Sequence, residues 1–383
     1  MSIPTEQTSS RPVEAWFEWT SPGEAYTVGA EEELMLVHPP GWALAQTVET
    51  VLPSLAPHLA ERVQGETHGS ALEIGSRPFA TVAGVEDDLR SVRRELAEAL
   101  EPMGLRAACA GTHPFAVWHD TIVSSGERYQ AVYGSMRELA RREPTFALHV
   151  HVGVPDPEDA IALMNRMRTH LPLLLALSAN SPFWQGRDSG LASARTPLFQ
   201  AFPRVGIPRV FNDYHDYVDA VDLLVRCGSI PEPTFLWWDV RPQPRFGTIE
   251  VRIMDSQVRV EHTGAITALV QSIARLEIES GYVTPKTMWA AEVLDENRFL
   301  AARDGMDADL IDVDTETRRP AREVLDDLLQ ACAPHAQALG CAEQLDRVPE
   351  LAEKTGSQRQ LELAEDDDRL PGLVEALSDA FVA

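Results

Sequence analysis

The stretch FALHVHVGVP, residues 146–155, alternates two histidines with aliphatic residues. Successive side chains of a β-strand point to opposite faces, so His149 and His151 share one face while Leu148 and Val150 share the other. The aliphatic residues predict a strand with one face in the hydrophobic core. Because a buried imidazole is unfavourable without a partner, the two histidines fit structural partners and a ligand or phosphate contact about equally well.

A second stretch, VGAEEELML at residues 28–36, carries two acidic residues with the same spacing. The period of two places Glu31 and Glu33 on one face and Glu32 and Leu34 on the other. Taken alone, a Glu–x–Glu pair is more typical of a solvated outer face of a sheet. Beside the histidine pair, it becomes a second strand with two polar side chains on one face.

A third stretch, TIEVRIMD at residues 248–255, has one apolar face and one ionic face. The alternation predicts that Glu250, Arg252 and Met254 point the same way, opposite the aliphatic side chains. In isolation a Glu–x–Arg pair is more often a surface ion pair that contributes under about 1 kcal/mol. The joint occurrence of three such strands favours a shared polar face instead.

Two more glutamates lie in GETHGSALEIGS, residues 65–76. If all these strands share one sheet face, five carboxylates converge there: Glu31, Glu33, Glu66, Glu73 and Glu250. Two carboxylates about 4 Å apart repel by roughly 4 kcal/mol at an effective dielectric constant near 20, so five cannot be ionised together without compensation. Divalent cations would supply it, and an oxygen-rich site favours Mg²⁺ or Mn²⁺ over zinc.

Composition limits the partners that the chain can have. Lysine and arginine total 33 against 59 aspartates and glutamates, giving a formal net charge of −26 over 383 residues. This charge repels a phosphate backbone, so we expect no nucleic-acid partner. The four cysteines have no CxxC spacing, which argues against a structural zinc site or a disulfide framework and indicates the cytoplasm.

The order of the patterns predicts the fold class. No segment approaches the ~18 apolar residues of a membrane span, and we expect residues 1–20 to be a flexible tail before a single domain at 21–383. Strand patterns cover 26–37, 71–76, 106–112, 146–154 and 247–255. Helical patterns cover 85–101, 157–177, 261–280, 286–302, 320–340 and 369–382. Strands followed by helices predict an α+β fold with an antiparallel or mixed sheet, one face covered by helices and the other free for chemistry.

Taken together, the motifs resemble the bacterial carboxylate–amine ligases related to glutamate–cysteine ligase, in the glutamine synthetase superfamily. The matching stretches are VGAEEEL, GTHPFAVW, RY at 128–129, HVHVGV, LLALSANSPFWQGRDSGLASAR, WWDVRPQPRFGTIEVRIMD and GSQRQ. The resemblance implies a curved, mostly antiparallel sheet like the glutamine synthetase catalytic domain, with helices packed on its convex face. It also implies that ATP and divalent metals, Mg²⁺ or Mn²⁺, bind on the concave face.

The resemblance also implies roles for individual residues. One metal would be held by Glu33, Glu66 and Glu73, and the metal that bridges the ATP phosphates by Glu31, His149 and Glu250. His151 would contact phosphate, and Arg252 would clamp a carboxylate or phosphate. Three further arginines are candidates for binding ATP or the substrate α-carboxylate, although each could instead form an ion pair that stabilises a loop: Arg195, Arg241 and Arg245.

The activity implied is ATP-dependent ligation of the glutamate γ-carboxylate to an amine through an acyl phosphate, with L-cysteine as the default acceptor. Two enzymatic alternatives stay open, namely a different amine acceptor and a phosphotransferase on the same scaffold. A catalytically silent binding protein is disfavoured, because all three strands keep their ionic residues. The expected partners are small molecules and further copies of the chain, as for relatives that self-associate.

Overall fold

The structure, a computed structural model, describes residues 15–142, 144–366 and 370–383. Its central sheet contains β1 (Val28–His38), β2 (Ala43–Leu44), β3 (Val63–Gly65), β4 (Ala71–Gly75), β5 (Arg106–Ala108), β6 (Ala147–Gly153), β11 (Val240–Gln243) and β12 (Thr248–Asp255). The strand order is β11–β12–β6–β1–β4–β3, with β2 and β5 also paired to β1, and every pairing is antiparallel. The predicted α+β class with a mostly antiparallel sheet is confirmed.

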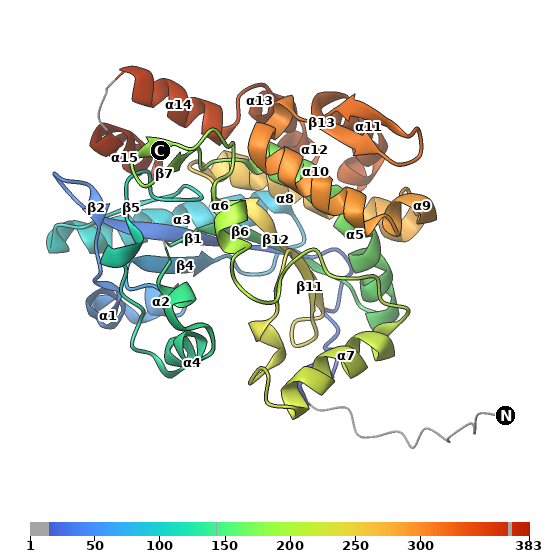
Figure 1. Cartoon of the computed structure of the whole chain (residues 1–383), viewed down its shortest axis with the longest axis horizontal. Helices are drawn as coiled ribbons and strands as arrows, with labels where there is room; N and C mark the ends of the chain where they lie inside the picture. Colours follow the sequence, from blue (N-terminus) through green and yellow to red (C-terminus); the bar gives the residue numbers. More distant parts are fainter. Residues whose placement is uncertain (1–14, 143, 367–369) are drawn as a thin grey trace.

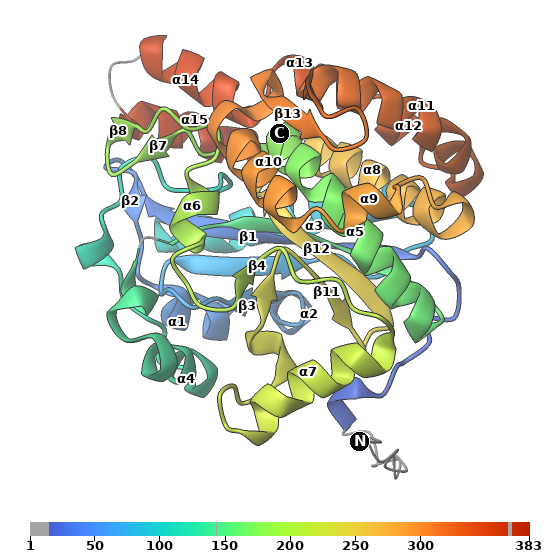
Figure 2. The same cartoon turned by 45° about the vertical axis from the view of Figure 1, so that its right-hand side comes forward.

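One face of the sheet is covered by helices. Three long helices pack directly against it: α3 (Val82–Leu100), α5 (Pro157–Ser178) and α8 (Val260–Ser280). Outside them lie α10 (Ala291–Asp304), α11 (Ala321–Leu339), α12 (Ala342–Leu345) and α13 (Val348–Glu353), at the top of Figures 1 and 2. The start of α5 illustrates the local cause, since Asp156 caps the backbone N–H groups of Glu158 and Asp159 and proline occupies the first helical position.

The predicted helix at 286–302 is divided in the structure. A short helix α9 (Pro285–Met288) is capped by Trp289, and α10 begins only at Ala291. The residue between them, Ala290, has a ψ of 65°, outside the helical region, and this interrupts the chain of helical hydrogen bonds.

The opposite face of the sheet is only partly covered. A second, smaller core lies on this side near the end of β1. It includes Met35 and Phe146, and also Leu373 and Leu377 from α15 (Leu370–Ala380), which lies next to α14 (Gly356–Asp366). Below the sheet in both views lie α4 (Glu127–Met136) and α7 (Tyr214–Arg226) (Figures 1 and 2). The remaining short elements are α1 (Val48–Val51), α2 (Pro57–Ala60), α6 (Arg195–Phe199), β7 (Phe183–Trp184), β8 (Arg187–Asp188), β9 (Val205–Gly206), β10 (Trp237–Trp238), β13 (Asp309–Asp312), β14 (Thr317–Pro320), and the 3₁₀ helices η1 (Ala15–Phe17), η2 (Leu52–Ser54), η3 (Glu101–Met103), η4 (Trp118–Asp120), η5 (Arg137–Arg141), η6 (Pro233–Phe235) and η7 (Gly305–Asp307).

The predicted alternation of side chains between the two faces of β12 is wrong at Met254. The register with β6 shifts between Val251 and Met254, so that Met254 lies opposite Leu148, a core residue. A β-bulge inserts extra residues into one strand and changes which face the following side chains occupy. Met254 therefore joins the buried core instead of the ionic face that holds Glu250 and Arg252.

Residues 15–20, within the predicted tail of residues 1–20, contact the folded chain. Phe17 is buried, and the indole N–H of Trp19 donates a hydrogen bond to the carbonyl of Val154. These contacts fix the segment against the end of β6, whereas residues 1–14 lie outside the described residues. Within the described parts of the chain, no helix is long and apolar enough to cross a bilayer.

Candidate active site

The antiparallel register brings the three ionic strands together. Glu31 on β1 lies opposite His149 on β6, and Glu250 on β12 lies opposite His151. Side chains that face each other across an antiparallel pair lie on the same face of the sheet. The alternation seen in the sequence therefore directs these four side chains to one surface, the face that the long helices leave open.

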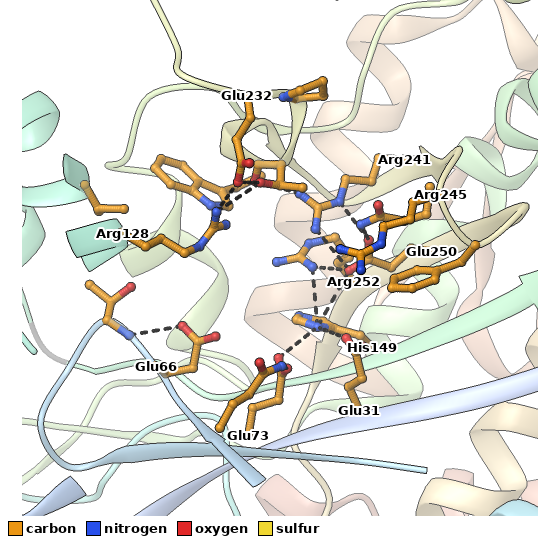
Figure 3. Close-up of a pocket in the computed structure, with 18 of the residues that line it drawn as sticks. Glu31, Glu66, Glu73, Arg128, His149, Glu232, Arg241, Arg245, Glu250 and Arg252 are labelled. Carbon is orange, nitrogen blue, oxygen red and sulfur yellow. Dashed lines mark hydrogen bonds and ion pairs between the residues drawn. The ribbon is translucent and has the colours of Figure 1, made fainter. Parts of the chain in front are cut away.

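His149 is the centre of this surface (Figure 3). Its Nδ1 lies 3.4 Å from Glu31 Oε2 and 3.8 Å from both Glu73 Oε2 and Glu250 Oε1. Its Nε2 lies 3.6 Å from Glu33 Oε1. The imidazole is thus surrounded by four carboxylates from β1, β4 and β12.

Glu66 and Glu73 complete a group that we call the carboxylate cluster: Glu31, Glu33, Glu66 and Glu73. Glu73 is placed by pairing of β4 with β1, where it lies opposite Glu33. Glu66 reaches the cluster from the turn after β3 and accepts a hydrogen bond from the backbone N–H of Thr67 at 3.1 Å. The sequence-predicted acidic residues therefore do converge.

The carboxylate cluster, together with His149, His151 and Glu250, contains three overlapping groups of residues that could hold a metal ion. In each group the candidate ligand atoms lie within 4.8 Å of one another. The groups are Glu31–Glu73–His149, Glu31–His151–Glu250 and Glu33–Glu66–Glu73. Carboxylate oxygens, which provide most of the ligand atoms in each group, are typical ligands of Mg²⁺ and Mn²⁺. The residues present therefore fit divalent cations.

Electrostatics separate the carboxylates into two kinds. Burial and the neighbouring Glu33 raise the pKa of Glu66 to about 7. Burial, followed by Glu31, Glu66 and Glu33, raises the pKa of Glu73 well above its usual value. Mutual repulsion in a buried site favours the protonated form, and only added positive charge would allow these groups to ionise together.

Glu250 is held ionised by arginines. It accepts a hydrogen bond from Arg241 Nε at 2.7 Å and another from Gln243 Nε2 at 2.6 Å, and it forms an ion pair with Arg252. Although burial acts in the opposite direction, Arg241 and Arg252 hold the pKa of Glu250 well below its usual value. Arg252 Nη1 also lies 3.4 Å from Nδ1 of His149, and burial followed by this charge lowers the pKa of His149. A neutral imidazole is the form that binds metals.

Both ring nitrogens of His151 have a polar neighbour, but only Nδ1 is within hydrogen-bond geometry. Nδ1 lies 3.0 Å from the hydroxyl of Thr248, while the buried Nε2 is 3.5 Å from Glu31 Oε2 and has no hydrogen-bond partner among the described residues. Burial lowers the pKa of His151, but the charge of Glu31 outweighs it and raises the pKa overall. The ring can therefore offer a proton-bearing Nε2 to an anion.

These groups line a cavity of about 590 Å³. Arg241, Arg245 and Arg252 all border it, on the side opposite the carboxylate cluster (Figure 3). Arg245 is exposed, and its guanidinium stacks over Phe246, whose ring lies 6.1 Å from that of His151. The cavity thus has an acidic floor and a basic wall, which could hold a polyanion together with its cations.

Arg195 is the one predicted site residue that lies elsewhere. It is buried, its guanidinium donates to the carbonyls of Ile253 and Arg252, and it lies 3.7 Å from Asp255. It does not border the cavity. In the structure, Arg195 supports the bulged end of β12 from outside the cavity.

Some residues that contact the cluster carried no recognisable sequence signal. Gln64, opposite Glu73 in β3, donates a hydrogen bond to it at 2.5 Å, and Gln243 does the same for Glu250. A single glutamine on a short strand has no diagnostic spacing. Arg128 and Tyr129 were recognisable only as the RY dipeptide, and both line the cavity.

Comparison with known proteins agrees with this geometry. The profile of glutamate–cysteine ligase family 2 (GCS2) matches residues 27–377. A protein of Rubrobacter xylanophilus with the provisional name glutamate–cysteine ligase 2-1 is 43% identical over 341 residues, 89% of this chain and 90% of that protein. A protein of Sorangium cellulosum with the provisional name glutamate–cysteine ligase 2 is 39% identical, over 88% of this chain and 91% of that protein.

Solved structures share the fold at low sequence identity. The glutamate–cysteine ligase of Francisella tularensis, solved in complex with AMP, superposes with a TM-score of 0.68 at 13% identity, covering 94% of this chain and 90% of that chain. A bifunctional glutathione synthetase of Pasteurella multocida gives a TM-score of 0.67 at 14% identity, over 93% of this chain and 53% of that chain. With the family profile spanning nearly the whole sequence, the chain belongs to glutamate–cysteine ligase family 2, a family of ATP-dependent carboxylate–amine ligases.

Proposed function

We propose that the protein uses ATP to join the γ-carboxylate of glutamate to an amine through an acyl phosphate, with L-cysteine as the default acceptor. The observation that carries this proposal is that the carboxylate cluster and the arginines Arg241, Arg245 and Arg252 line the same cavity. Family membership supports the reaction class. The relatives' names support glutamate and cysteine as the substrates to test first.

We propose that the divalent cations are Mg²⁺ or Mn²⁺, held in two sets. One set is Glu33, Glu66 and Glu73. The other is Glu31, His149 and Glu250, and two groups of close ligand atoms differ from it by one residue, Glu31–Glu73–His149 and Glu31–His151–Glu250. When bound, such cations offset phosphate charge and orient the γ-phosphate for in-line displacement. The raised pKa values of Glu66 and Glu73 support a cation here, since added positive charge would let both groups ionise.

The reaction needs two displacements. An oxygen of the glutamate γ-carboxylate forms a bond to the γ-phosphorus of ATP while the bond to the β-phosphate oxygen breaks and ADP leaves. The amine nitrogen then forms a bond to the acyl carbon, phosphate leaves, and the amine loses a proton to the surroundings. Phosphate is a far better leaving group than the oxide ion that a free carboxylate would have to expel.

The chain's own residues bind and orient the anions in this scheme. Arg252 lies between Glu250 and His149, where its planar guanidinium can bind a phosphoryl or carboxylate oxygen next to the cluster. The exposed Arg245 lines the same cavity and can also bind phosphate. His151 can donate from Nε2, which has no hydrogen-bond partner among the described residues. Arg241 fixes Glu250 and contributes charge without needing to move.

The test is an ADP-release screen of the purified protein with ATP, Mg²⁺, glutamate and a panel of amines, with mass spectrometry of the products. A ligase releases ADP only when glutamate and an amine are both present, and it yields a γ-glutamyl amide. A phosphorylated acceptor in place of an amide would identify a phosphotransferase. No ADP release with glutamate and any amine would overturn the proposal. Glu98→Gln, which removes an exposed carboxylate on α3, is the control for variants that remove a carboxylate of the cluster, and it should release ADP like the unaltered protein.

We further propose that residues 21–383 act as one catalytic domain in the cytoplasm and that copies of the chain self-associate. Both walls of the cavity are carried by strands and helices attached to a single sheet. The four cysteines are free thiols, which fits a reducing compartment. Analytical ultracentrifugation would measure the assembly state.

A further inference from the structure

Arg252 lies in the irregular part of strand β12. In the register described for β12 and β6, the pairing passes from Val251 directly to Met254, so Arg252 lies within the bulge. A bulge disrupts the regular ladder of hydrogen bonds, and the backbone there needs other partners. The side chain of Arg252 nevertheless keeps a defined place between Glu250 and His149 (Figure 3). Something outside the β6 ladder must therefore hold its backbone.

The backbone of Arg252 is held by two residues from other elements. Its N–H donates a hydrogen bond to the carbonyl of Asp239 at 2.8 Å, and its carbonyl accepts one from Arg195 Nη2 at 3.2 Å. Asp239 also directly precedes β11, the edge strand beside β12, and so fixes where that strand begins. Two residues further on, Arg241 lies opposite Glu250 and donates to it. Asp239 is thus connected to both arginines that pair with Glu250.

Asp239 is anchored by a buried ion pair with helix α10. Arg298 donates to the Asp239 carboxylate from Nε at 2.6 Å and from Nη2 at 3.3 Å. Its Nη1 donates to Gln200 Oε1 at 2.6 Å. The side chains of Arg298 and Asp239 are only 10% and 6% exposed. Because a two-pronged contact fixes direction as well as distance, Asp239 cannot shift without breaking this pair.

The same guanidinium is connected to the aromatic part of the cavity wall. Gln200 follows α6, and the chain then runs to Gly206, whose carbonyl accepts a hydrogen bond from the N–H of Asp239 at 2.9 Å. Phe199 and Phe202, at the start of this segment, line the cavity and pack edge to face with ring centres 5.3 Å apart. One buried cation therefore ties two parts of the cavity wall to the helical layer.

Folding stability alone does not account for a pair of this kind. Among the described residues that line the cavity, neither Arg298 nor Asp239 occurs, so the pair has no direct contact with a ligand there. Removing two charges from water costs several kcal/mol per ion, and apolar residues of similar volume often stabilise a fold equally well or better. The pair supplies what apolar contacts lack, a directional hold on the main chain that carries Arg252.

We propose that Arg298 is a positioning residue of the ligase, which acts through Asp239 to hold Arg252 and the start of β11 in place for phosphoryl transfer. The inference rests on the proposed function and extends it to a residue outside the cavity. Displacing a group at the reacting centre by about 1 Å can lower a rate about 100-fold. Arg298 thus affects the rate without contacting any substrate.

The test measures kcat and KM for ADP release by purified variants, at a temperature where circular dichroism shows each one to be folded. Arg298→Met should lower kcat about 10- to 100-fold. KM for the amine should change less than about twofold, because the residues that Arg298 holds are those proposed to bind phosphate and not the amine. Asp239→Asn, which keeps the shape and the main chain, should lower kcat about 10-fold. This variant carries the same comparison if Arg298→Met does not fold.

A double variant tests whether Arg298 acts through Asp239. If it does, Arg298→Met combined with Asp239→Asn should lower kcat no further than Arg298→Met alone, because both changes remove one interaction. Losses that multiply would show that the two residues act independently, and this would overturn the proposed route through Asp239.

Two variants of the same helix separate positioning from a general loss of stability. Asn297 is buried beside Arg298 and exchanges hydrogen bonds with the backbone of Ile311, at 2.8 and 2.7 Å, on β13. Asn297→Leu should therefore lower the thermal midpoint but leave kcat of the folded protein unchanged. Arg303→Met removes an exposed arginine of α10 and should change neither quantity.

The outcomes for the two proposals are distinct. If the unaltered protein releases no ADP with glutamate and any amine, the ligase function fails, and the role of Arg298 fails with it. If the unaltered protein is active but Arg298→Met keeps its full kcat, or if Asn297→Leu lowers kcat equally, only the role of Arg298 is overturned. Since the comparison requires only ATP turnover, it holds for whichever amine the enzyme accepts.

Discussion

The two faces of strand β1 carry adjacent glutamates with opposite surroundings. Glu32 points to the helix-covered face, where it is fully buried and accepts hydrogen bonds from Arg93 Nε at 2.8 Å and Nη2 at 2.7 Å, and also from the hydroxyl of Thr263. Glu31 and Glu33 point to the cavity, where Glu31 lies beside His149 and His151 and Glu33 lies beside Glu66 and Glu73. One strand thus carries a buried Glu32–Arg93 ion pair on one face and part of the carboxylate cluster on the other.

The difference distinguishes charge that serves folding from charge that serves a ligand. On the helix side, Arg93 also donates to the carbonyls of Val258, Gln257 and Phe381, so the pair closes a network that ties α3 to the C-terminal segment. On the cavity side, neither Glu66 nor Glu73 forms an ion pair with an arginine or lysine of the described residues. A folded protein tolerates such a deficit only by keeping protons or by binding cations.

The largest expected effect comes from the cavity side. Glu73→Gln should lower kcat/KM by at least about 10³-fold, because it removes a proposed ligand shared by two of the candidate metal sets. The thermal midpoint of the metal-free protein should stay the same or rise, since the change removes a group whose ionised form is disfavoured by burial and by three neighbouring glutamates. Coupled ADP release and calorimetry measure the two quantities. Full activity with a lowered midpoint would remove Glu73 from the site.

The helix side should respond in the opposite way. Arg93→Met leaves Glu32 buried without its partner, and breaking a buried pair in this manner typically destabilises by 3–5 kcal/mol. Denaturant unfolding should reveal this loss, with no rescue by Mg²⁺. Arg90→Met on the same helix removes solvent-exposed pairs with Asp87 and Glu261 and should change the unfolding free energy by less than about 1 kcal/mol. Equal losses in the two variants would contradict the contrast between the faces.

A smaller effect should depend on pH and only on the cavity side. Burial and Glu33 raise the pKa of Glu66 to about 7. The contribution of protonated Glu66 to the folding stability is therefore fully present below the ordinary pKa of 4.5 and is lost as the pH rises through 7. In the presence of a chelator, the thermal midpoint should therefore fall between pH 5 and pH 8. Added Mg²⁺ should raise the midpoint more at pH 8 than at pH 5. If Mg²⁺ raised the thermal midpoint equally at pH 5 and at pH 8, the result would argue against cation binding at Glu66.

The sequence predicted the ionic face because period-two patterning is local. Glu31 and His149 could be assigned to one surface before their strands were known to pair, since both alternate with aliphatic residues. The pattern was wrong at Met254, because a bulge depends on how β12 and β6 pair and leaves no mark in a single strand. The position of Arg195 could not be predicted for a related reason, since an arginine at the start of a short helix can face either a cavity or backbone carbonyls.

The residues on the far side of the cavity were the hardest to predict. Arg128 and Glu232 are 104 positions apart, and neither has a diagnostic spacing. Their contact depends on how α4 and the segment around η6 are placed relative to the sheet, and that placement is tertiary information. A sequence pattern can report which residues share a strand face, but it cannot report which loops meet above it.

The smallest expected effect compares two threonines, one on each face. Thr248→Val removes the hydroxyl that lies 3.0 Å from His151 Nδ1 but keeps the side-chain shape. Loss of one hydrogen bond of about 1 kcal/mol should raise KM for ATP roughly fivefold with little change in kcat, because His151 would be less well oriented toward phosphate. Thr248→Ser, which restores the hydroxyl, should restore KM. Thr263→Val removes the matching donor to Glu32 and should lower the unfolding free energy while leaving KM for ATP unchanged. If the two valine variants affected KM equally, the faces of β1 would not be functionally separate.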